Sequence, residues 1–502
     1  MYYDGESPMS GSNQDRTHGN EKKGFYSMSS QAGLSEKDRK FREFSLNASA
    51  WKVILYVSVP LALYQSLNQL FKILDSLMAS HISSSAVSTI SYLSQLDMTL
   101  SALGGGLAVG AGVKISEAYG AGDFDLVKKR VSTLYSLCAA VSILLLGVLL
   151  PFTEEFLRFA GTPEEFMADG VSYFRLDLIG MVIMFFNNVY ISVERARGHS
   201  RWILILNVAV IAVKLILTAV FVYGFHGGIH MIAIATIISQ ALMFAAAAIN
   251  ICQPGNAFGF SFSSISLKKT VVLPILTLSG PVIVEKAAFS LGKVLVNSMS
   301  TVYGALTVGA LGISNNIGGI STTPHIGFQD GSSAIISQNL GAGKPARALE
   351  IFFWTAAINM AISTVTMILN LVFLRQITWL FAQNDPAFQE LIMSIYRFEA
   401  WGAIPLGINS AVVGMLYGFG KTKSTLFINF CRVFAFRVPV LWALQQFTSL
   451  GSVSVGIVMA FSNIAVGVLS AVIGFFTIRQ ICREYHISLK KRPKKTALHP
   501  AS

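Results

Sequence analysis

An eight-residue sequence occurs twice in the chain. It reads ISEAYGAG at residues 115–122 and ISQNLGAG at residues 336–343, 221 positions later. Two further landmarks repeat in nearly the same register: Pro60 returns as Pro281 at an offset of 221, and Gly198-x-Ser200-Arg201 returns as Gly420-x-Thr422-Lys423 at an offset of 222. Three landmarks in register are hard to obtain by chance. We infer that the chain contains two copies of one structural unit.

The composition places both copies in a membrane. Of the 502 residues, 53% are apolar and only 13% are charged, whereas a soluble domain usually carries about 25% charged residues. A membrane-spanning helix needs about 20 mostly apolar residues. Twelve segments meet this need, near residues 53–80, 87–114, 131–152, 171–194, 202–224, 228–251, 271–300, 305–338, 349–374, 395–418, 425–448 and 453–478. The sequence therefore predicts an all-α polytopic membrane protein with twelve transmembrane helices.

Each copy then holds six helices, so both copies run in the same direction through the bilayer. They should be related by a pseudo-two-fold axis along the membrane normal, as in transporters built from parallel repeats. We expect four parts: a disordered tail over residues 1–45 with a short surface helix over 34–44, a first six-helix lobe over 46–255, a second over 256–480 and a basic tail over 481–502. A cavity between the lobes would open to each side of the membrane in turn.

The loops between the predicted helices differ in charge. Lys and Arg residues lie in alternate loops, for example at 128–130 and 268–269, and such loops usually face the cytoplasm. An even number of helices puts both termini on that side, so we expect a cell-membrane protein with both termini in the cytoplasm. The basic stretch over residues 490–495 should then contact anionic lipid head groups.

Other classes of protein fit the sequence poorly. A net charge of +12 would suit a nucleic-acid-binding protein, but the basic residues lie between apolar segments rather than on one face. Four cysteines in 502 residues cannot hold a disulfide scaffold together. No carboxylate pair with metal-ligand histidines, no nucleophile with a base and no nucleotide-binding loop stands out, which disfavours an enzyme. We expect a monomer with no resident cofactor.

Several short motifs point to one transporter family. Between residues 279 and 350 the sequence contains Gly280-Pro281, Tyr303-Gly304-Ala305, Gln338-Asn339 and Gly341-Ala342-Gly343-Lys344. Over roughly residues 50–480 the chain resembles the multidrug and toxic compound extrusion (MATE) transporters, whose second-half signature these motifs match. The resemblance implies a two-lobed antiporter that expels organic cations in exchange for sodium ions or protons. A related lipid-linked precursor flippase, or an exporter of anionic substrates, is the alternative.

One carboxylate lies deep in the first predicted helix. A charge in the hydrocarbon core costs about 2.5–3.5 kcal/mol, so Asp75 should face the interior of the bundle and have a partner. A carboxylate can hold a proton, a sodium ion or a cationic substrate. The resemblance matches Asp75 to the first-lobe cation-site aspartate of the family. A structural salt bridge with Lys72 is the alternative.

Lys214 in the fifth predicted helix departs from the family pattern. Members of the family commonly have Asn at the Lys214 position and Asp at the Thr218 position, and those side chains would help to hold sodium. A cation and a hydroxyl in their places favour coupling to protons over coupling to sodium ions. We hypothesise that the Lys214 ammonium replaces the ion and pairs with Asp75. A purely structural pair, or a Lys214 that receives an anionic substrate, remains open.

A second ionisable candidate lies in the seventh predicted helix. Glu285 stands four residues after Pro281, so both residues lie on one helix face. It could be the second-lobe proton or cation site, or it could pair with one of the nearby cations Lys286, Lys293, Arg432 and Arg437. Asp97 and Asp177 are expected near helix ends or in internal pairs.

Neutral polar residues within the helices complete the set. The candidates for lining the cavity are Thr218, Asn187, Asn188, Ser239, Gln240 and Asn409. Hydrogen bonding between neighbouring helices is the alternative role of such side chains.

Overall fold

The computed structural model describes residues 34–79, 84–162, 164–225, 227–253, 255–382 and 385–487, and every regular element in these ranges is a helix. The first half of the chain forms α2 (Glu36–Asn47), α3 (Ala50–Ala79), α4 (Ser84–Ala121), α5 (Phe124–Leu149), α6 (Thr153–Phe159), α7 (Glu164–Ala196), α8 (Ser200–Ala219) with the π-helical turn Val220–Gly224, and α9 (Ile229–Ile251). The all-α prediction is confirmed.

The second half repeats this pattern. It forms α10 (Lys269–Ser300), α11 (Ala305–Gly341), α12 (Pro345–Val372), α13 (Leu374–Ala382), α14 (Pro386–Glu399), α15 (Ala403–Gly418), α16 (Thr422–Phe434), α17 (Val438–Phe447) and α18 (Val453–Glu484). Helices α14 and α15 together cover the predicted tenth segment, and α16 and α17 cover the eleventh. A break before Pro439 separates α16 from α17, because proline cannot donate the backbone hydrogen bond that would continue the helix.

Eleven stretches of the described residues are long and apolar enough to cross a bilayer. The predicted eighth helix, α11, is not among them, although it is 37 residues long. It contains many Ser, Thr, Asn and Gly residues, which lower its hydropathy. It packs against α3, α4, α12 and α15, so neighbouring helices rather than lipid surround much of its polar surface.

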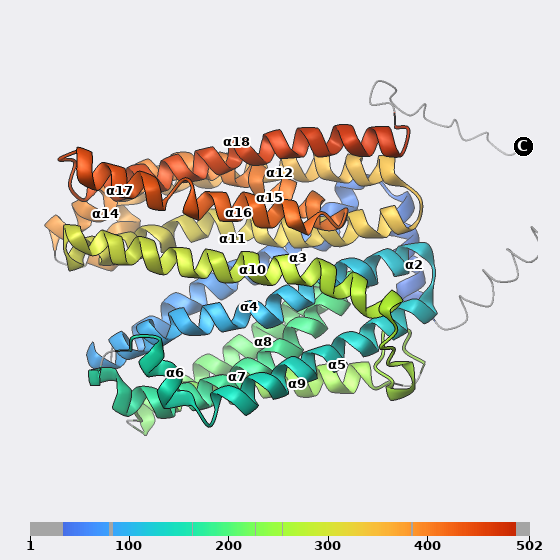
Figure 1. The fold of residues 1–502 in the computed structure, drawn as a ribbon, viewed down its shortest axis with the longest axis horizontal. Coiled ribbons are helices and arrows are strands. Elements are labelled where there is room, and N and C mark those ends of the chain that lie inside the picture. Colours follow the sequence, from blue (N-terminus) through green and yellow to red (C-terminus); the bar gives the residue numbers. More distant parts are fainter. Residues whose placement is uncertain are drawn as a thin grey trace, which may run out of the picture.

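The helices form two lobes that lie side by side (Figure 1). Two seams join them: α4 packs along α10, and α3 packs along α11. Glycines make the first seam tight. A Cβ on Gly106 would lie 2.7 Å from the backbone nitrogen of Ile283, and one on Gly110 would lie 2.5 Å from that of Ser279. Such close backbone approach requires small residues.

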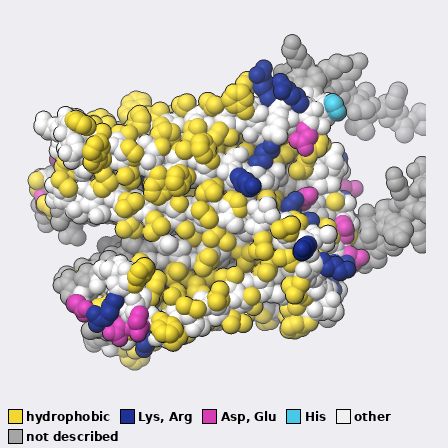
Figure 2. Space-filling model, in the orientation of Figure 1, with side chains coloured by type: hydrophobic (Ala, Val, Ile, Leu, Met, Phe, Trp, Pro, Cys, Tyr) yellow, Lys and Arg dark blue, Asp and Glu magenta, His cyan; other side chains and the backbone are white. Residues whose placement is uncertain are grey.

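The two ends of the molecule differ. Helix α2 and the C-terminal end of α18 lie at the same end of the molecule, which we call the closed end because the lobes meet there (Figure 1). At the opposite end, which we call the open end, the surface is hollowed between the lobes (Figure 2). The described Lys and Arg side chains visible on this face gather mostly toward the closed end. The lobes therefore leave a cleft that reaches inward from the open end.

Residues 36–47 correct one expectation. This stretch forms the ordered helix α2, longer at its C-terminus than the short surface helix expected over residues 34–44 within a disordered tail. Ser35 caps it by accepting a hydrogen bond from the backbone N–H of Asp38 at 3.1 Å. Asp38 and Phe41 are buried, whereas the side chains of Glu36 and Lys40 are 67% and 73% exposed. Helix α2 is therefore a surface helix that packs one face against the protein.

Candidate transport site

The first lobe brings together three ionisable side chains from three helices. Asp177 of α7 interacts electrostatically with Asp97 of α4 and with Lys214 of α8. All three side chains are partly buried. Two carboxylates beside one ammonium form a group whose charge balance changes when a proton or a cation binds. The sequence analysis placed Asp97 and Asp177 near helix ends or in internal pairs and did not connect them with Lys214.

The predicted pair between Asp75 and Lys214 stays a prediction. The backbone of Asp75 belongs to α3, but its side chain, like that of Lys72, lies outside the described residues. The electrostatic interaction of Lys214 with Asp177 of α7 indicates that this lysine faces other helices of the first lobe. It therefore lies inside the bundle, as a charge within a membrane-spanning helix must.

Glu285 is the best-defined carboxylate of the second lobe. It is 6% exposed and accepts three hydrogen bonds, from Tyr417 Oη at 2.8 Å, Thr425 Oγ1 at 2.6 Å and Asn429 Nδ2 at 2.8 Å. Of the four cations predicted as partners, Lys286 interacts with it electrostatically. Hydroxyl groups can both donate and accept. The contacts with Tyr417 and Thr425 therefore suit Glu285 with or without a proton.

A second buried carboxylate, at the end of α14, was not singled out from the sequence. Glu399 is 8% exposed and accepts a hydrogen bond of 2.5 Å from Ser314 of α11. It interacts electrostatically with Arg437, Arg432 and Lys293. It lies near the start of the predicted tenth segment, over residues 395–418, but the sequence did not show its partners, because only the folded chain brings it to these cations.

Three of the six neutral polar candidates, Asn187, Gln240 and Asn409, form hydrogen bonds between neighbouring helices. Asn187 of α7 donates to the carbonyl oxygen of Gln240 of α9 at 3.0 Å and to its side-chain oxygen at 2.8 Å. Ser470 of α18 donates to Asn409 of α15 at 2.7 Å. These are the contacts expected of the interhelical alternative.

The other three candidates remain less defined. Ser239 donates to the carbonyl oxygen of Thr236 at 2.8 Å, within its own helix. Thr218 is buried, and its hydroxyl has no hydrogen-bond partner among the described residues. Asn188 is half-buried. Whether any of the six lines the cavity stays a prediction.

The repeated octapeptides meet at the closed end. A Cβ added to Gly120 would lie 1.9 Å from the carbonyl oxygen of Gln338, and one added to Gly341 would lie 1.9 Å from that of Glu117. An ion pair of 2.9 Å between Arg195 and Asp330 also crosses from the first lobe to the second. The sequence that revealed the duplication therefore forms the crossing point of the two lobes.

A Gly120→Ala substitution tests this crossing. The added methyl group cannot fit while α4 and α11 stay in contact, so we expect the closed end to open and transport to fall by at least about tenfold, equivalent to ~1.4 kcal/mol. Gly147→Ala is the matched control, since nothing lies within 4 Å of a Cβ at that position. Equal transport by both variants would show that the close contact is dispensable.

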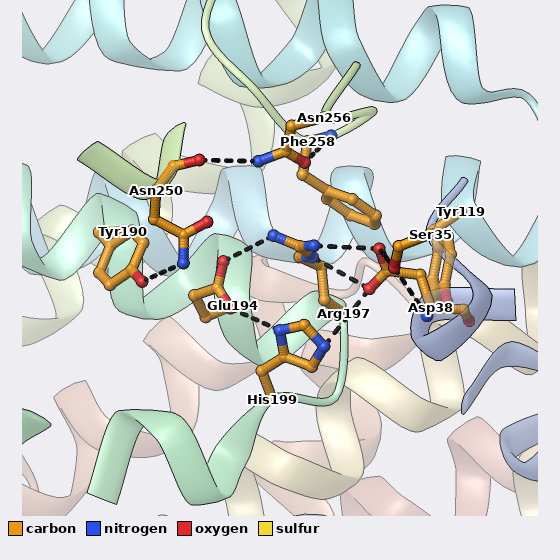
Figure 3. Close-up of polar contacts among 10 residues, drawn as sticks. All are labelled: Ser35, Asp38, Tyr119, Tyr190, Glu194, Arg197, His199, Asn250, Asn256 and Phe258. Atoms are coloured by element: carbon orange, nitrogen blue, oxygen red, sulfur yellow. Dashed lines mark hydrogen bonds and ion pairs between the residues drawn. The ribbon is translucent and has the colours of Figure 1, made fainter. Parts of the chain in front are cut away.

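Helix α2 is tied to the first lobe by a buried ionic network (Figure 3). Arg197 donates to both carboxylate oxygens of Asp38, at 3.1 and 3.0 Å, and to Glu194 at 3.0 Å. His199 lies between the same two carboxylates, with Nδ1 2.8 Å from Glu194 and Nε2 3.4 Å from Asp38. Tyr119 donates to the carbonyl oxygen of Asp38 at 2.5 Å. Burial by itself lowers the pKa of Arg197, but Glu194 and Asp38 outweigh it and the net pKa is raised.

The same helix reaches the second lobe. Ser45 donates to the side-chain oxygen of Gln338 at 2.5 Å. Gln338 in turn donates to the carbonyl oxygen of Ala196 at 2.8 Å. Lys344 donates to the side chain of Asn47 at 2.8 Å. Helix α2 thus bridges the two lobes at the closed end.

Comparison with known proteins identifies this architecture. A family model described as MatE matches residues 60–221 and 281–443, well over half of the chain. The chain belongs to the MatE family. The two matched ranges start at Pro60 and Pro281, the prolines that repeat in the sequence, so the predicted duplication and the resemblance to MATE transporters are confirmed. A MatE protein is a membrane transporter and not an enzyme.

The relatives and solved structures extend over most of the chain. The "Probable multidrug resistance protein YoeA" of Bacillus subtilis (strain 168) is 24% identical over 413 residues, covering 80% of this chain and 88% of YoeA. The "Multidrug export protein MepA" of Staphylococcus haemolyticus (strain JCSC1435) is 22% identical over 424 residues, covering 83% and 92%. A crystal structure of MATE in complex with MaL6 has a TM-score of 0.84 at 18% identity, covering 90% of this chain and 100% of that one. This likeness shows the fold.

Proposed function

We propose that this MatE transporter exports small amphipathic organic compounds carrying a positive charge, in exchange for protons. The observation that carries the proposal is that both lobes contain carboxylates shielded from solvent. In the first lobe these are Asp97 and Asp177, which are partly buried, and in the second lobe it is Glu285, which is buried. A carboxylate buried in a membrane protein marks an ion or substrate pathway. The names of the relatives YoeA and MepA, which refer to multidrug resistance and export, support the substrate class.

Competition for the carboxylates explains the exchange. A cationic compound and a proton each neutralise a carboxylate, so binding of one weakens binding of the other. With the cleft open to the outside, proton uptake displaces the bound compound. After the lobes rock, the protons leave toward the cytoplasm and a new compound binds there. Each cycle therefore moves one compound outward at the expense of protons that move inward.

The orientation follows from charge. The basic loops lie toward the closed end (Figure 2), and basic loops favour the cytoplasmic side. We therefore place the closed end and both termini in the cytoplasm of a cell-membrane protein, with the open end outside. The arrangement corresponds to an outward-open state.

Lys214 underlies our preference for protons over sodium ions. Its ammonium already supplies a fixed positive charge beside Asp177, where a sodium ion would otherwise be needed. In a Lys214→Asn variant, sodium can take the vacated place. We expect proton-driven export to fall by about tenfold, equivalent to ~1.4 kcal/mol, and to be partly restored by sodium. Unchanged transport and unchanged sodium dependence would contradict this role.

Reconstitution in vesicles tests the function itself. The purified protein is placed in lipid vesicles, proton and sodium gradients are imposed separately, and the movement of a fluorescent cationic dye is followed. We expect movement driven by the proton gradient. Movement under neither gradient would overturn the antiporter proposal, and movement driven by sodium alone would overturn the coupling preference.

A further inference from the structure

Three cations of the second lobe surround one aromatic ring. The charged groups of Arg432, Lys293 and Arg437 lie 5.1, 5.3 and 5.8 Å from the centre of the Phe289 ring. A ring face attracts a cation, but like charges so close together repel one another. Such a cluster within a membrane protein needs compensating negative charge.

In the part of the chain that the structure describes, the negative charge near the two arginines does not balance them. Glu399 interacts electrostatically with all three cations, yet among the described residues no ion pair within 4.0 Å joins it to either arginine. Arg432 and Arg437 instead donate to the neutral Asn463 at 2.8 and 3.0 Å. The Nε atom of Arg432 is buried without a hydrogen-bond partner among the described residues. Among the described residues, one carboxylate beside two arginines leaves an excess of positive charge.

The cluster continues the Glu285 site along two helices. Phe289 and Lys293 follow Glu285 at four-residue steps on α10, so they share its helix face. On α16, Arg432 follows Thr425 and Asn429, which both donate to Glu285. Lys293 and Arg432 are half-buried, and a charge facing lipid is costly. Their accessible parts should therefore face the cleft between the lobes.

We propose that Arg432 and Lys293 form an anion subsite that holds the acidic group, a carboxylate or a phosphate, of the transported compound. Arg437, which is 4% exposed, lies behind them and adds its positive charge. The inference rests on the proposed function and refines its substrate class. The first lobe offers the carboxylates Asp97 and Asp177 to a positive group, and the second lobe offers a guanidinium and an ammonium group to a negative one. The preferred substrates are amphipathic compounds that carry both charges.

Two dyes with one chromophore test this subsite. Rhodamine B carries a cationic ring system and a free carboxylate, whereas its ethyl ester is cationic only. We expect the purified protein to bind rhodamine B about tenfold more tightly than the ester, as measured by fluorescence anisotropy, and to export it faster from vesicles. In Arg432→Gln, binding of rhodamine B should weaken while binding of the ester strengthens, because a repelling charge is gone.

Arg479→Gln is the matched control, since Arg479 also lies over a phenylalanine ring, at 5.0 Å from that of Phe475, but is exposed. It should leave both affinities unchanged. Opposite shifts for the two dyes cannot arise from misfolding, which would weaken both. If Arg432→Gln does not fold, two measurements still test the subsite: the preference of the parent protein for rhodamine B over its ethyl ester, and the same pair of affinities in the Lys293→Gln variant.

The outcomes separate the two proposals. Equal affinity of the parent for both dyes, or parallel losses in Arg432→Gln, would overturn the anion subsite while leaving the transporter intact. A parent that moves neither dye under any gradient would instead overturn the proposed function.

Discussion

Glu285→Gln is expected to lower proton-driven export by about a hundredfold, which corresponds to ~2.7 kcal/mol. The amide keeps the size of the side chain and can still accept from Asn429 or Tyr417, so the fold should tolerate it. What the amide loses is the exchangeable proton. Transport of a cationic dye by vesicles under a proton gradient measures the loss, and dye binding measured across a range of pH should become less sensitive to pH.

The control is the same substitution at an exposed position. Glu154 of α6 pairs with Arg158 at 3.2 Å, and its side chain is 54% exposed, so Glu154→Gln should transport as the parent does. If Glu285→Gln retains export within twofold of the parent, Glu285 is not the coupling carboxylate of the second lobe. Glu399 in the second lobe, and Asp177 with Asp97 in the first, would then be the next candidates.

The sequence predicted the architecture well because hydropathy and internal repetition are properties of the chain itself. Pro60 and Pro281 occupy equivalent positions in the two repeats, and the two ranges matched by the family model begin at these prolines. Helix α11 was also predicted, near residues 305–338, although its hydropathy is too low for a membrane span. Its central position lets it keep polar residues that a lipid-facing helix could not carry.

The candidate site was predicted less completely, for a physical reason. Spacing along one helix shows which residues share a face, as with Pro281 and Glu285, but it does not show which helices meet. Asp177 and Lys214 come from different helices, and only packing brings them together. Asp38 lay in the short surface helix expected over residues 34–44, where nothing indicated a buried partner. Its buried partner Arg197 is 159 residues away, so no local pattern could have revealed the pair.

We expect the Arg197→Gln substitution to destabilise the closed end strongly. The substitution leaves Asp38 and Glu194, which are 2% and 1% exposed, without the guanidinium that now donates to both. Removing one partner of a buried ion pair typically costs about 3–5 kcal/mol. We expect a lower unfolding temperature and, because α2 bridges the lobes, weaker contact between them. Distance measurements between spin labels on α2 and α12 would detect the separation.

Two further variants give this prediction its controls. Arg158 of α6 also bonds two glutamates, Glu154 and Glu164, but its side chain is 51% exposed, and exposed ion pairs contribute little to stability. Arg158→Gln should therefore leave both measurements unchanged. Asp38→Asn combined with Arg197→Gln removes one unpaired carboxylate and should recover part of the loss, because effects within one network are not additive. If the double variant loses as much as the sum of the single ones, Asp38 and Arg197 act independently, and their ion pair is not what holds α2 to the first lobe.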